Sequence, residues 1–325
     1  MKKFLISLIS FVGIACVTCF MGLIVFGRFA PFSIRPNLPY VLGGVGYSYT
    51  RFDEAKKVEK NVDVLVVGSS HAYRGYDPRI FAKQRWKLFN LGSSSQTPIQ
   101  TAYLFTKYMA RFQPKLVIID VYPILFKSDG IESVIDLVSN AELDTGLVNL
   151  SLSHNNISIY NTLFYRALAD VLEFNDDFKE ENPNKNGDLY VSGGYVQSTD
   201  RFKGAKYYKS VNYSFLPDQI RAFERIIHTL KERKIPYLIL QSPIPQAKYK
   251  HVTNNIFADK LFAKYGFYRN ANEHLKLPDS CFLDESHLNQ FGVNHYNKYV
   301  IDLIKNYGFL KARDKNYQLA TNTHL

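Results

Sequence analysis

Short runs of apolar residues set a regular pattern in the chain after residue 60. The first run, Val64–Val67, is continuously apolar and mostly β-branched, and Val62 extends it on the far side of Asp63. Such a run is typical of a strand buried on both faces of a parallel sheet. The same kind of pattern predicts three further strands, at Arg85–Leu91, Lys115–Val121 and Ile235–Pro243.

Helical patterns alternate with these strands. The predicted helices are Pro98–Phe112, Pro217–Lys234, Thr253–Tyr265 and a C-terminal helix with Val293, Tyr296, Val300 and Ile304 on one face. Strands that alternate with helices at this spacing indicate βαβ units. We therefore expect an α/β fold with a doubly wound, mainly parallel sheet in three α/β/α layers.

The middle of the chain is less regular. Residues 175–212 are rich in Asn, Asp, Lys and Gly, and a structureless loop of that length is unusual inside a compact domain unless it forms a lid or a binding insertion. We expect one α/β domain at 61–310 with an insertion at about 175–212, followed by a polar tail at 311–325.

The N-terminus carries a long apolar segment. The 23 residues Phe4–Phe26 have no charge, and about 20 apolar residues cross the hydrocarbon core of a bilayer. A cleaved signal peptide would have a shorter apolar core, and a buried soluble helix would show a polar face. We therefore expect a transmembrane anchor at 1–28, with residues 4–26 in the lipid bilayer, and a juxtamembrane connector at 29–60.

Lys2 and Lys3 favour a cytoplasmic N-terminal tail. This orientation predicts a single-pass membrane protein whose bulk lies outside the cytoplasm, in the cell envelope.

Composition and charge narrow the partners only slightly. Lys and Arg exceed Asp and Glu by 40 − 29 = 11, which permits an anionic partner such as phospholipid headgroups or an acidic glycan. The chain has neither of the common glycine-rich nucleotide motifs, and its His residues lack metal-ligand spacing. We expect no cofactor, no metal and no nucleic-acid partner.

A serine follows the first predicted strand, in the sequence Gly68-Ser69-Ser70-His71. Open α/β sheets place their active sites outside the carboxyl ends of strands, where a tight turn exposes a serine hydroxyl and its backbone N–H. Gly92 ends the second strand and could bring a second N–H to the same edge. Each of these sequences is also common in plain turns, and Ser69 is a rival to Ser70.

Asp284 and His287 lie just before the C-terminal helix. A nucleophilic serine needs a base to accept its proton, and the base needs a carboxylate that orients the ring and stabilises the imidazolium. Asp and His three residues apart can face one pocket. The sequence thus predicts a triad of Ser70, His287 and Asp284.

This layout resembles the SGNH (GDSL-like) hydrolases. Ser70 matches the nucleophile of that family, Gly92 its second-block glycine, and Asp284 and His287 its closing pair. With an N-terminal anchor, the chain is similar to the membrane-bound SGNH proteins of bacterial surface acylation, of the D-alanyl-lipoteichoic-acid biosynthesis type and the alginate and peptidoglycan O-acetylation types. The resemblance implies a membrane-bound O-acyltransferase as a partner.

The third block of the family departs from the pattern. The family has an Asn there whose side chain completes the oxyanion hole, whereas this chain has Asp120-Val121-Tyr122-Pro123. Loss of one oxyanion donor costs about 10²–10³ in rate. Either Tyr122, Gln96 or a backbone group substitutes beside the N–H groups of Ser70 and Gly92, or the protein is a slow or specialised acyl-transfer protein.

The resemblance implies a membrane-anchored serine esterase or O-acyltransferase that acts on acyl esters of a surface glycan or its acyl carrier. Two alternatives are a non-catalytic SGNH-like scaffold in a surface acylation system and an ordinary lipase-like esterase. The intact Ser, His and Asp argue against the scaffold. The lack of an apolar acyl-binding stretch outside the anchor argues against the lipase-like esterase.

The orientation of the anchor can be tested with a reporter fused after Leu325. Because the two N-terminal lysines favour the cytoplasm, an alkaline phosphatase fusion should be active and a cytoplasm-dependent fluorescent fusion dark. A mature protein that begins after Gly27, or cytoplasmic reporter activity, would contradict the predicted topology.

Overall fold

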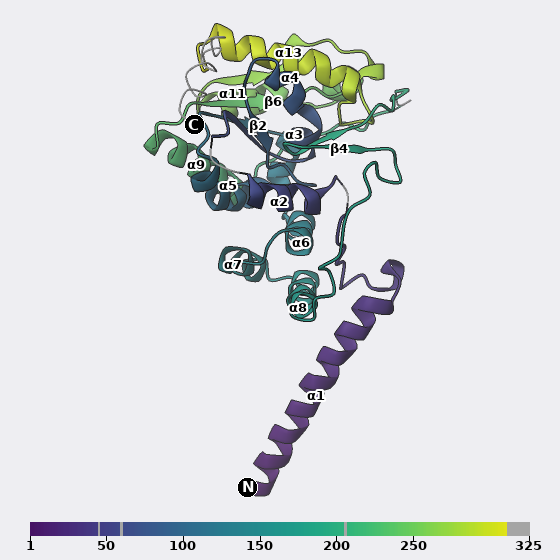
Figure 1. Cartoon of the computed structure of the whole chain (residues 1–325). Helices are drawn as coiled ribbons and strands as arrows, with labels where there is room; N and C mark the ends of the chain where they lie inside the picture. The colour runs from purple at the N-terminus through teal and green to yellow at the C-terminus, as the bar shows by residue number, and fades with distance from the viewer. Residues whose placement is uncertain (45, 59–60, 205–206, 311–325) are drawn as a thin grey trace, which may run out of the picture.

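The computed structural model describes residues 1–310 except 45, 59–60 and 205–206, and the predicted tail at 311–325 lies outside the described residues. Its centre is a parallel sheet in the order β2-β1-β3-β6-β7 (Figure 1). The strands are β1 (Val64–Val67), β2 (Leu88–Asn90), β3 (Leu116–Asp120), β6 (Tyr237–Gln241) and β7 (Tyr268–Asn270). The predicted α/β class with a doubly wound, mainly parallel sheet is confirmed.

Alternate residues of the central strands enter two separate cores. Leu65 and Val67 of β1 pack on one face of the sheet, whereas Val64 and Val66 pack on the other. All four side chains are fully buried, which explains why the strand is apolar without alternation. The sheet is therefore covered on both sides, as the α/β/α layering requires.

Helices on the first face are α5 (Pro98–Phe112), α9 (Pro217–Glu232) and α11 (Asn255–Ala263), and those on the second are α3 (Ser70–Gly75), α4 (Pro78–Ala82) and α13 (Gln290–Asn306). Their ends follow local rules. A capping box between Thr97 and Gln100 starts α5, and Gln113 in the left-handed conformation ends it. Asn289 caps α13 through the N–H groups of Phe291 and Gly292.

A further helical layer lies between the sheet domain and the N-terminal helix (Figure 1). It consists of α6 (Ile131–Asn140), α7 (Thr145–Ser153) and α8 (Ile157–Val171), in a part of the chain for which the sequence pattern predicted no element. Leu137 and Ile159 are fully buried and join the core beneath the sheet. This layer widens the domain toward α1.

The predicted connector also contributes to the domain. Helix α2 (Ser48–Lys57) buries Phe52 and Ala55 completely in the core of the first face. The remaining short elements are α10 (Gln246–Lys250), α12 (Ala271–His274) and 3₁₀ turns at Phe32–Ile34, Pro123–Lys127 and Asp279–Cys281. The structured domain therefore begins before residue 61.

The predicted insertion contains an antiparallel hairpin of β4 (Leu189–Val191) and β5 (Tyr195–Gln197). Tyr195 and Val196 are buried, so β5 lies against the domain. The short helix α3, which begins at Ser70, contacts this strand. Part of the insertion is thus packed next to the turn that carries the predicted nucleophile.

Helix α1 (Lys2–Phe29) extends away from the domain (Figure 1). Its most apolar 18-residue window has a mean hydropathy of 2.5 and none of that window is buried. Among the described residues it is the one helix long and apolar enough to cross a membrane. Within the described part of the chain, only its C-terminal part, around Phe20 and Gly27, contacts the rest of the protein, and an exposed apolar surface of this size marks an interaction site.

Candidate active site

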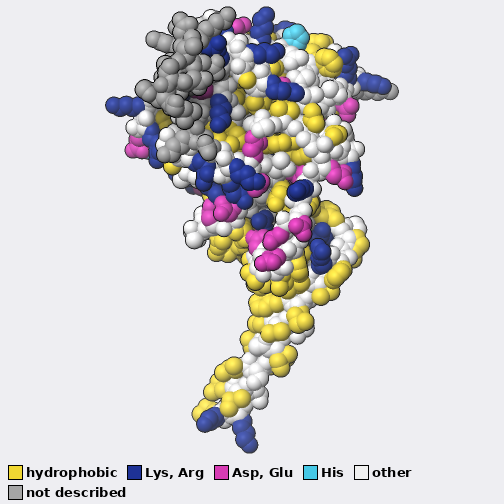
Figure 2. All heavy atoms as spheres, in the orientation of Figure 1, with side chains coloured by type: hydrophobic (Ala, Val, Ile, Leu, Met, Phe, Trp, Pro, Cys, Tyr) yellow, Lys and Arg dark blue, Asp and Glu magenta, His cyan; other side chains and the backbone are white. Residues whose placement is uncertain are grey.

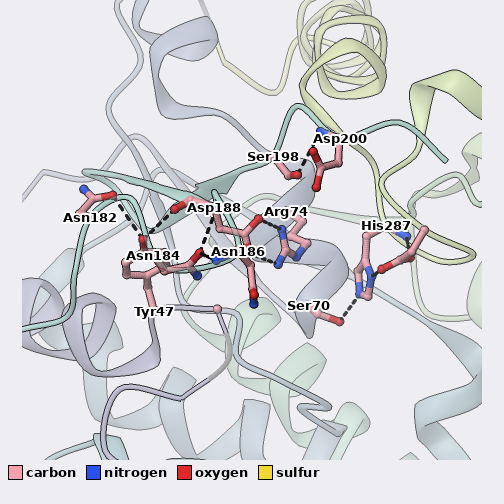
Figure 3. Close-up of polar contacts among 12 residues, drawn as sticks. Tyr47, Ser70, Arg74, Asn182, Asn184, Asn186, Asp188, Ser198, Asp200 and His287 are labelled. Carbon is pink, nitrogen blue, oxygen red and sulfur yellow. Dashed lines mark hydrogen bonds and ion pairs between the residues drawn. The ribbon is translucent and has the colours of Figure 1, made fainter.

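The structure brings the three predicted triad residues into one hydrogen-bonded chain. The Oγ atom of Ser70 lies 2.8 Å from Nε2 of His287, and Nδ1 of the same ring lies 2.8 Å from Oδ2 of Asp284 (Figure 3). Ser70 and His287 are 217 positions apart in the chain. The order and distances are those that a serine nucleophile, its general base and the orienting carboxylate require.

The carboxylate of Asp284 is held by several donors. Oδ1 accepts the backbone N–H groups of Ser286 at 2.7 Å and of His287 at 2.9 Å, and the imidazole ring faces both oxygens. Burial alone would raise the pKa of Asp284, but these hydrogen bonds and the His287 ring outweigh burial and hold it well below its ordinary value. The group is therefore an anion when His287 accepts a proton.

Close packing shapes the turn that carries the serine. Gly68 has φ +154°, and a Cβ there would lie 2.6 Å from the backbone oxygen of Asp120. A Cβ on Gly92 would lie 2.5 Å from the backbone oxygen of Ser69. Both glycines are required because the chain after β1 passes directly over its two neighbouring strands.

The structure separates the roles of the two adjacent serines. Ser69 is buried, and its Oγ accepts the N–H of His71 as the cap of α3. Ser70 is the residue whose Oγ faces His287. It lies at the carboxyl end of β1, which pairs with β2 on one side and β3 on the other, so this is the switch point at which ligands bind in such sheets.

Of the predicted oxyanion donors, two already have hydrogen-bond partners within the protein. The N–H of Ser70 is the first amide of α3, and the first amides of a helix have no acceptor within the helix. Gly92 donates its N–H to Oδ1 of Asn90 at 2.8 Å. Gln96 donates to Thr101 and accepts from Ser93, each at 2.9 Å. The amide of Gly92 and the side chain of Gln96 thus already have protein partners.

Tyr122 follows β3 and contributes an aromatic wall to the site. Its ring packs on the imidazole of His71 with centroids 3.9 Å apart, and the His71 ring lies 5.2 Å from that of His287. The Tyr122 hydroxyl interacts with Ser286, the neighbour of His287. Tyr122 therefore lies beside the triad, although its hydroxyl is already engaged.

His71 is buried, and its Nε2 has no hydrogen-bond partner among the described residues. Burial, together with the nearby His287 and Lys248, lowers the pKa of His71 well below its ordinary value. The His71 ring therefore lies between Tyr122 and His287 and limits the space open to the His287 ring.

Asn90 was missed by the sequence analysis. Its Nδ2 donates to the backbone oxygen of Ala72 at 2.6 Å, and its Oδ1 accepts the N–H of Gly92. The side chain thereby links the end of β2 to the first turn of α3. The sequence shows an Asn two residues before Gly92, but nothing local indicates that its side chain reaches α3.

The insertion is fixed to the nucleophile helix by a buried ion pair. Arg74, one helical turn after Ser70, forms two hydrogen bonds to the carboxylate of Asp188, at 2.6 and 3.2 Å (Figure 3). Burial disfavours the charged guanidinium, but Asp188 outweighs burial and raises the pKa of Arg74. Tyr47 donates to the backbone oxygen of Asp188 at 2.8 Å. The predicted binding insertion therefore reaches the side of the triad.

A small cavity opens beside the nucleophile turn. It admits the centre of a water-sized sphere over only about 20 Å³, which is room for one small group. The residues that line it include Ser69, Gln96 and Tyr122 together with the apolar Leu125 and Phe223, whereas Ser70 and His287 are not among the described lining residues.

Asp120 ends β3, and its side chain makes its hydrogen bonds on the second face of the sheet, with Tyr76 after α3. Its Oδ2 accepts the hydroxyl of Tyr76 at 2.8 Å and that of Ser242, and Tyr76 shares a hydrogen bond with Tyr296 at 2.8 Å. Burial raises the pKa of Asp120 to about 7. Asp120 therefore belongs to a buried hydrogen-bonded cluster beneath α3. Among the described residues it has no hydrogen bond to Ser70, His287 or Asp284.

Among the described residues, no group of three or more His, Cys, Asp or Glu side chains is arranged to hold a metal ion. The site as described is built from a hydroxyl, an imidazole, a carboxylate and backbone amides. These groups suffice for acyl transfer through a serine ester.

Comparisons with known proteins find similarity only among solved structures, several of which match this chain. A scan against protein-family models and a search of curated proteins find no match. A solved structure from Bacteroides fragilis, described as a "putative acylhydrolase", is similar over 82% of this chain and 98% of its own, with 12% identity and a TM-score of 0.30. Similarity at that level carries no argument about the site.

Asp120 should make stability depend on pH. The folded protein keeps this proton up to about pH 7, whereas the unfolded chain releases it near its ordinary value of 3.8. Between these pH values this group lowers the free energy of unfolding by about 1.4 kcal/mol per unit as pH rises. The side chain of Asp120→Asn cannot ionise and keeps an oxygen that accepts from Tyr76. The free energy of unfolding of this variant, relative to that of wild type, should therefore rise by a few kcal/mol between pH 4 and pH 8.

Urea unfolding of the full chain in detergent at several pH values measures this difference. The control is Asp129→Asn, an exposed aspartate at the start of α6 whose amide oxygen can still accept the N–H of Ile131. The control should follow the wild-type pH dependence. An Asp120→Asn curve parallel to wild type would show that Asp120 is ionised in the folded protein.

Proposed function

We propose that the protein is a membrane-anchored serine esterase or O-acyltransferase that acts on acyl esters of a cell-surface polysaccharide or of its acyl carrier. The observation that carries this proposal is the hydrogen-bonded chain from Ser70 through His287 to Asp284. Helix α1 supports the membrane location because it is exposed, apolar and long enough to cross a bilayer.

Ser70 attacks the ester carbonyl while His287 accepts the hydroxyl proton at Nε2. The imidazolium that forms is stabilised by the carboxylate of Asp284, which also holds Nδ1 in its protonated form. Collapse of the tetrahedral intermediate transfers the proton from His287 to the leaving alcohol and leaves the acyl group on Ser70. An acceptor hydroxyl, from water or from a sugar, then attacks the acyl carbonyl and gives its proton to His287, and His287 returns a proton to the Ser70 oxygen as the serine ester bond breaks.

The oxyanion is stabilised first by the N–H of Ser70. A second donor must be released from an existing partner, because the Gly92 amide binds Asn90 and the Gln96 side chain binds Thr101. A weak second donor lowers the rate by about 10²–10³. A positioned acceptor offsets this loss, since holding two reactants together is worth effective molarities of about 10⁵ M or more. The site therefore favours transfer over hydrolysis.

The acyl group is short in this proposal, because the cavity beside Ser69 has room for a group of about the size of an acetyl methyl. The insertion fixed by Arg74 and Asp188 supplies a surface next to the triad for the acceptor. A membrane-bound O-acyltransferase is the proposed donor partner, and the bulk of the chain is proposed to lie outside the cytoplasm.

The second candidate function is that of a non-catalytic scaffold. The occupied amide of Gly92 and the absence of an Asn at the end of β3 favour a non-catalytic scaffold within a surface acylation system. The two functions differ in whether Ser70 must be reactive: the enzyme requires a reactive Ser70, and the scaffold does not.

The identity of the nucleophile can be tested with a fluorophosphonate probe on the full chain in detergent. Because the Ser70 hydroxyl faces His287, whereas that of Ser69 caps α3, Ser70→Ala should abolish labelling, and His287→Ala should slow it by at least about 10²-fold. The matched control is Ser69→Ala, which loses a cap and keeps the nucleophile. Labelling that survives in Ser70→Ala would exclude Ser70, and an unlabelled wild type would favour the scaffold.

Transfer and hydrolysis can be separated by comparing cells with purified protein. Ser70→Ala or His287→Ala in cells should remove an ester from a surface polymer. The purified enzyme should hydrolyse p-nitrophenyl acetate only slowly, and the octanoate more slowly still, because the cavity excludes a long chain. Fast hydrolysis of simple acetates, with surface esters unchanged or increased in the Ser70→Ala strain, would instead identify a deacetylating esterase.

A further inference from the structure

The helical hairpin of α7 and α8 has an unusual sequence. Residues 145–165 contain no Lys, Arg, Asp or Glu, although 21% of the chain is charged. The polar residues that remain are Ser, Thr, Asn, His and Tyr. In α8 the two charges, Arg166 and Asp170, pair with each other at 2.6 Å. This composition avoids the side chains that are most costly to bring close to lipid.

Helix α8 is apolar on two faces. One face packs into the domain through Ile159, Thr162 and Ala169. The residues of the other face point away from the domain, and Ile157 and Val171 at its two ends are 59% and 78% exposed. Leu152 at the end of α7 and Leu172 after α8 extend this exposed apolar surface. Exposed apolar side chains clustered in this way mark an interaction surface.

The same helix lies against the membrane segment. Phe164, on its outward face, stacks on Phe20 of α1 with ring centroids 4.5 Å apart. One position further, Tyr165 lies so close to Gly27 that a Cβ on the glycine would meet its ring at 2.3 Å. Helix α8 therefore runs beside the last two turns of α1 and is not held above its end.

The depth of α8 follows from this contact. The charge-free segment of α1 ends at Phe26, and Phe20 lies six residues before it, or about 9 Å at 1.5 Å per residue. If α1 crosses the bilayer, Phe164 lies at the depth of Phe20, within the outer part of the apolar layer. If α1 is tilted from the membrane normal, this depth is smaller, but Phe164 still lies on the bilayer side of Phe26.

Cationic groups lie near the outer end of α1. Arg28 packs over the ring of Phe174, which follows α8, at 5.4 Å, and Arg35 donates to the backbone oxygen of Gly27 at 3.3 Å. Arginine at this position suits lipid phosphates. Figure 2 shows apolar side chains that continue from α1 onto the base of the domain.

We infer that the α7–α8 hairpin is a second membrane contact, inserted into the interfacial and outer acyl region of the lipid bilayer beside α1. This inference rests on the membrane anchoring proposed above and adds a surface to it. The occupant is lipid because the surface is continuous with the helix proposed to span the bilayer, and because residues 145–165 carry no Lys, Arg, Asp or Glu that would select a charged protein partner. An interfacial helix of this kind is buried by about 5–10 Å, which agrees with the depth of Phe20.

The inference is tested by tryptophan quenching in the full chain, reconstituted in vesicles with and without brominated acyl chains. Ile157→Trp introduces the probe on the hairpin. The matched control is Ile256→Trp on α11, which is 69% exposed and lies outside the membrane-proximal layer. The one native tryptophan, Trp86, is buried, and the wild-type protein gives its background. We expect a blue shift and strong bromine quenching for Ile157→Trp and neither for Ile256→Trp.

The outcomes distinguish this inference from the anchor itself. Equal, unquenched emission from both variants, in protein that resists carbonate extraction, would overturn the hairpin contact and leave the anchor intact. Protein released by carbonate would contradict the anchor. A photo-crosslinker at position 157 that captures a protein and not lipid in native membranes would also overturn the inference, and would show that a membrane protein covers the hairpin.

Discussion

Strand β1 pairs with β2 on one side and with β3 on the other. This pairing determines where the candidate site lies, because it brings the residues that follow all three strands to one edge of the sheet. Val64 aligns with Leu88 of β2 and with Leu116 of β3, so the chain leaves β1 and its two neighbours in different directions. A small cavity lined by Gly68 and Ser69 lies at the carboxyl end of β1, which is where ligands bind in such sheets. Ser70 stands at that point, with Gly92 after β2 and Tyr122 after β3 on either side.

Two carboxyl groups near this edge show how environment sets their chemistry. Asp284 receives two backbone N–H groups and faces the imidazole of His287, and its pKa is held well below the ordinary value. Asp120 receives two hydroxyls in a fully buried place, and burial raises its pKa to about 7. The first is an anion beside His287 over the ordinary pH range, whereas the second stays neutral up to about pH 7.

The site is held relative to the rest of the molecule by two connections. Arg74 and Asp188 fix the insertion to the helix that begins at Ser70. The layer of α6, α7 and α8 lies between the sheet domain and α1 (Figure 1). Phe164 and Tyr165 join this layer to α1 directly. The triad is therefore part of a body that packs against its own apolar N-terminal helix and does not depend on a flexible tether.

Local signals in the sequence predicted the four main strands and the helix Pro98–Phe112, and they made Ser70, His287 and Asp284 candidates for a triad. Buried strands need apolar runs, caps need particular side chains, and a serine triad needs three residue types at strand and helix ends, all of which are visible over short spans. Strand β7, the helices α6 to α8, the role of Asn90 and the pairing of Arg74 with Asp188 were decided by tertiary structure. Arg74 and Asp188 are 114 positions apart, and β7 has three residues at the edge of the sheet. Such features arise only when distant segments pack together, so no local pattern records them.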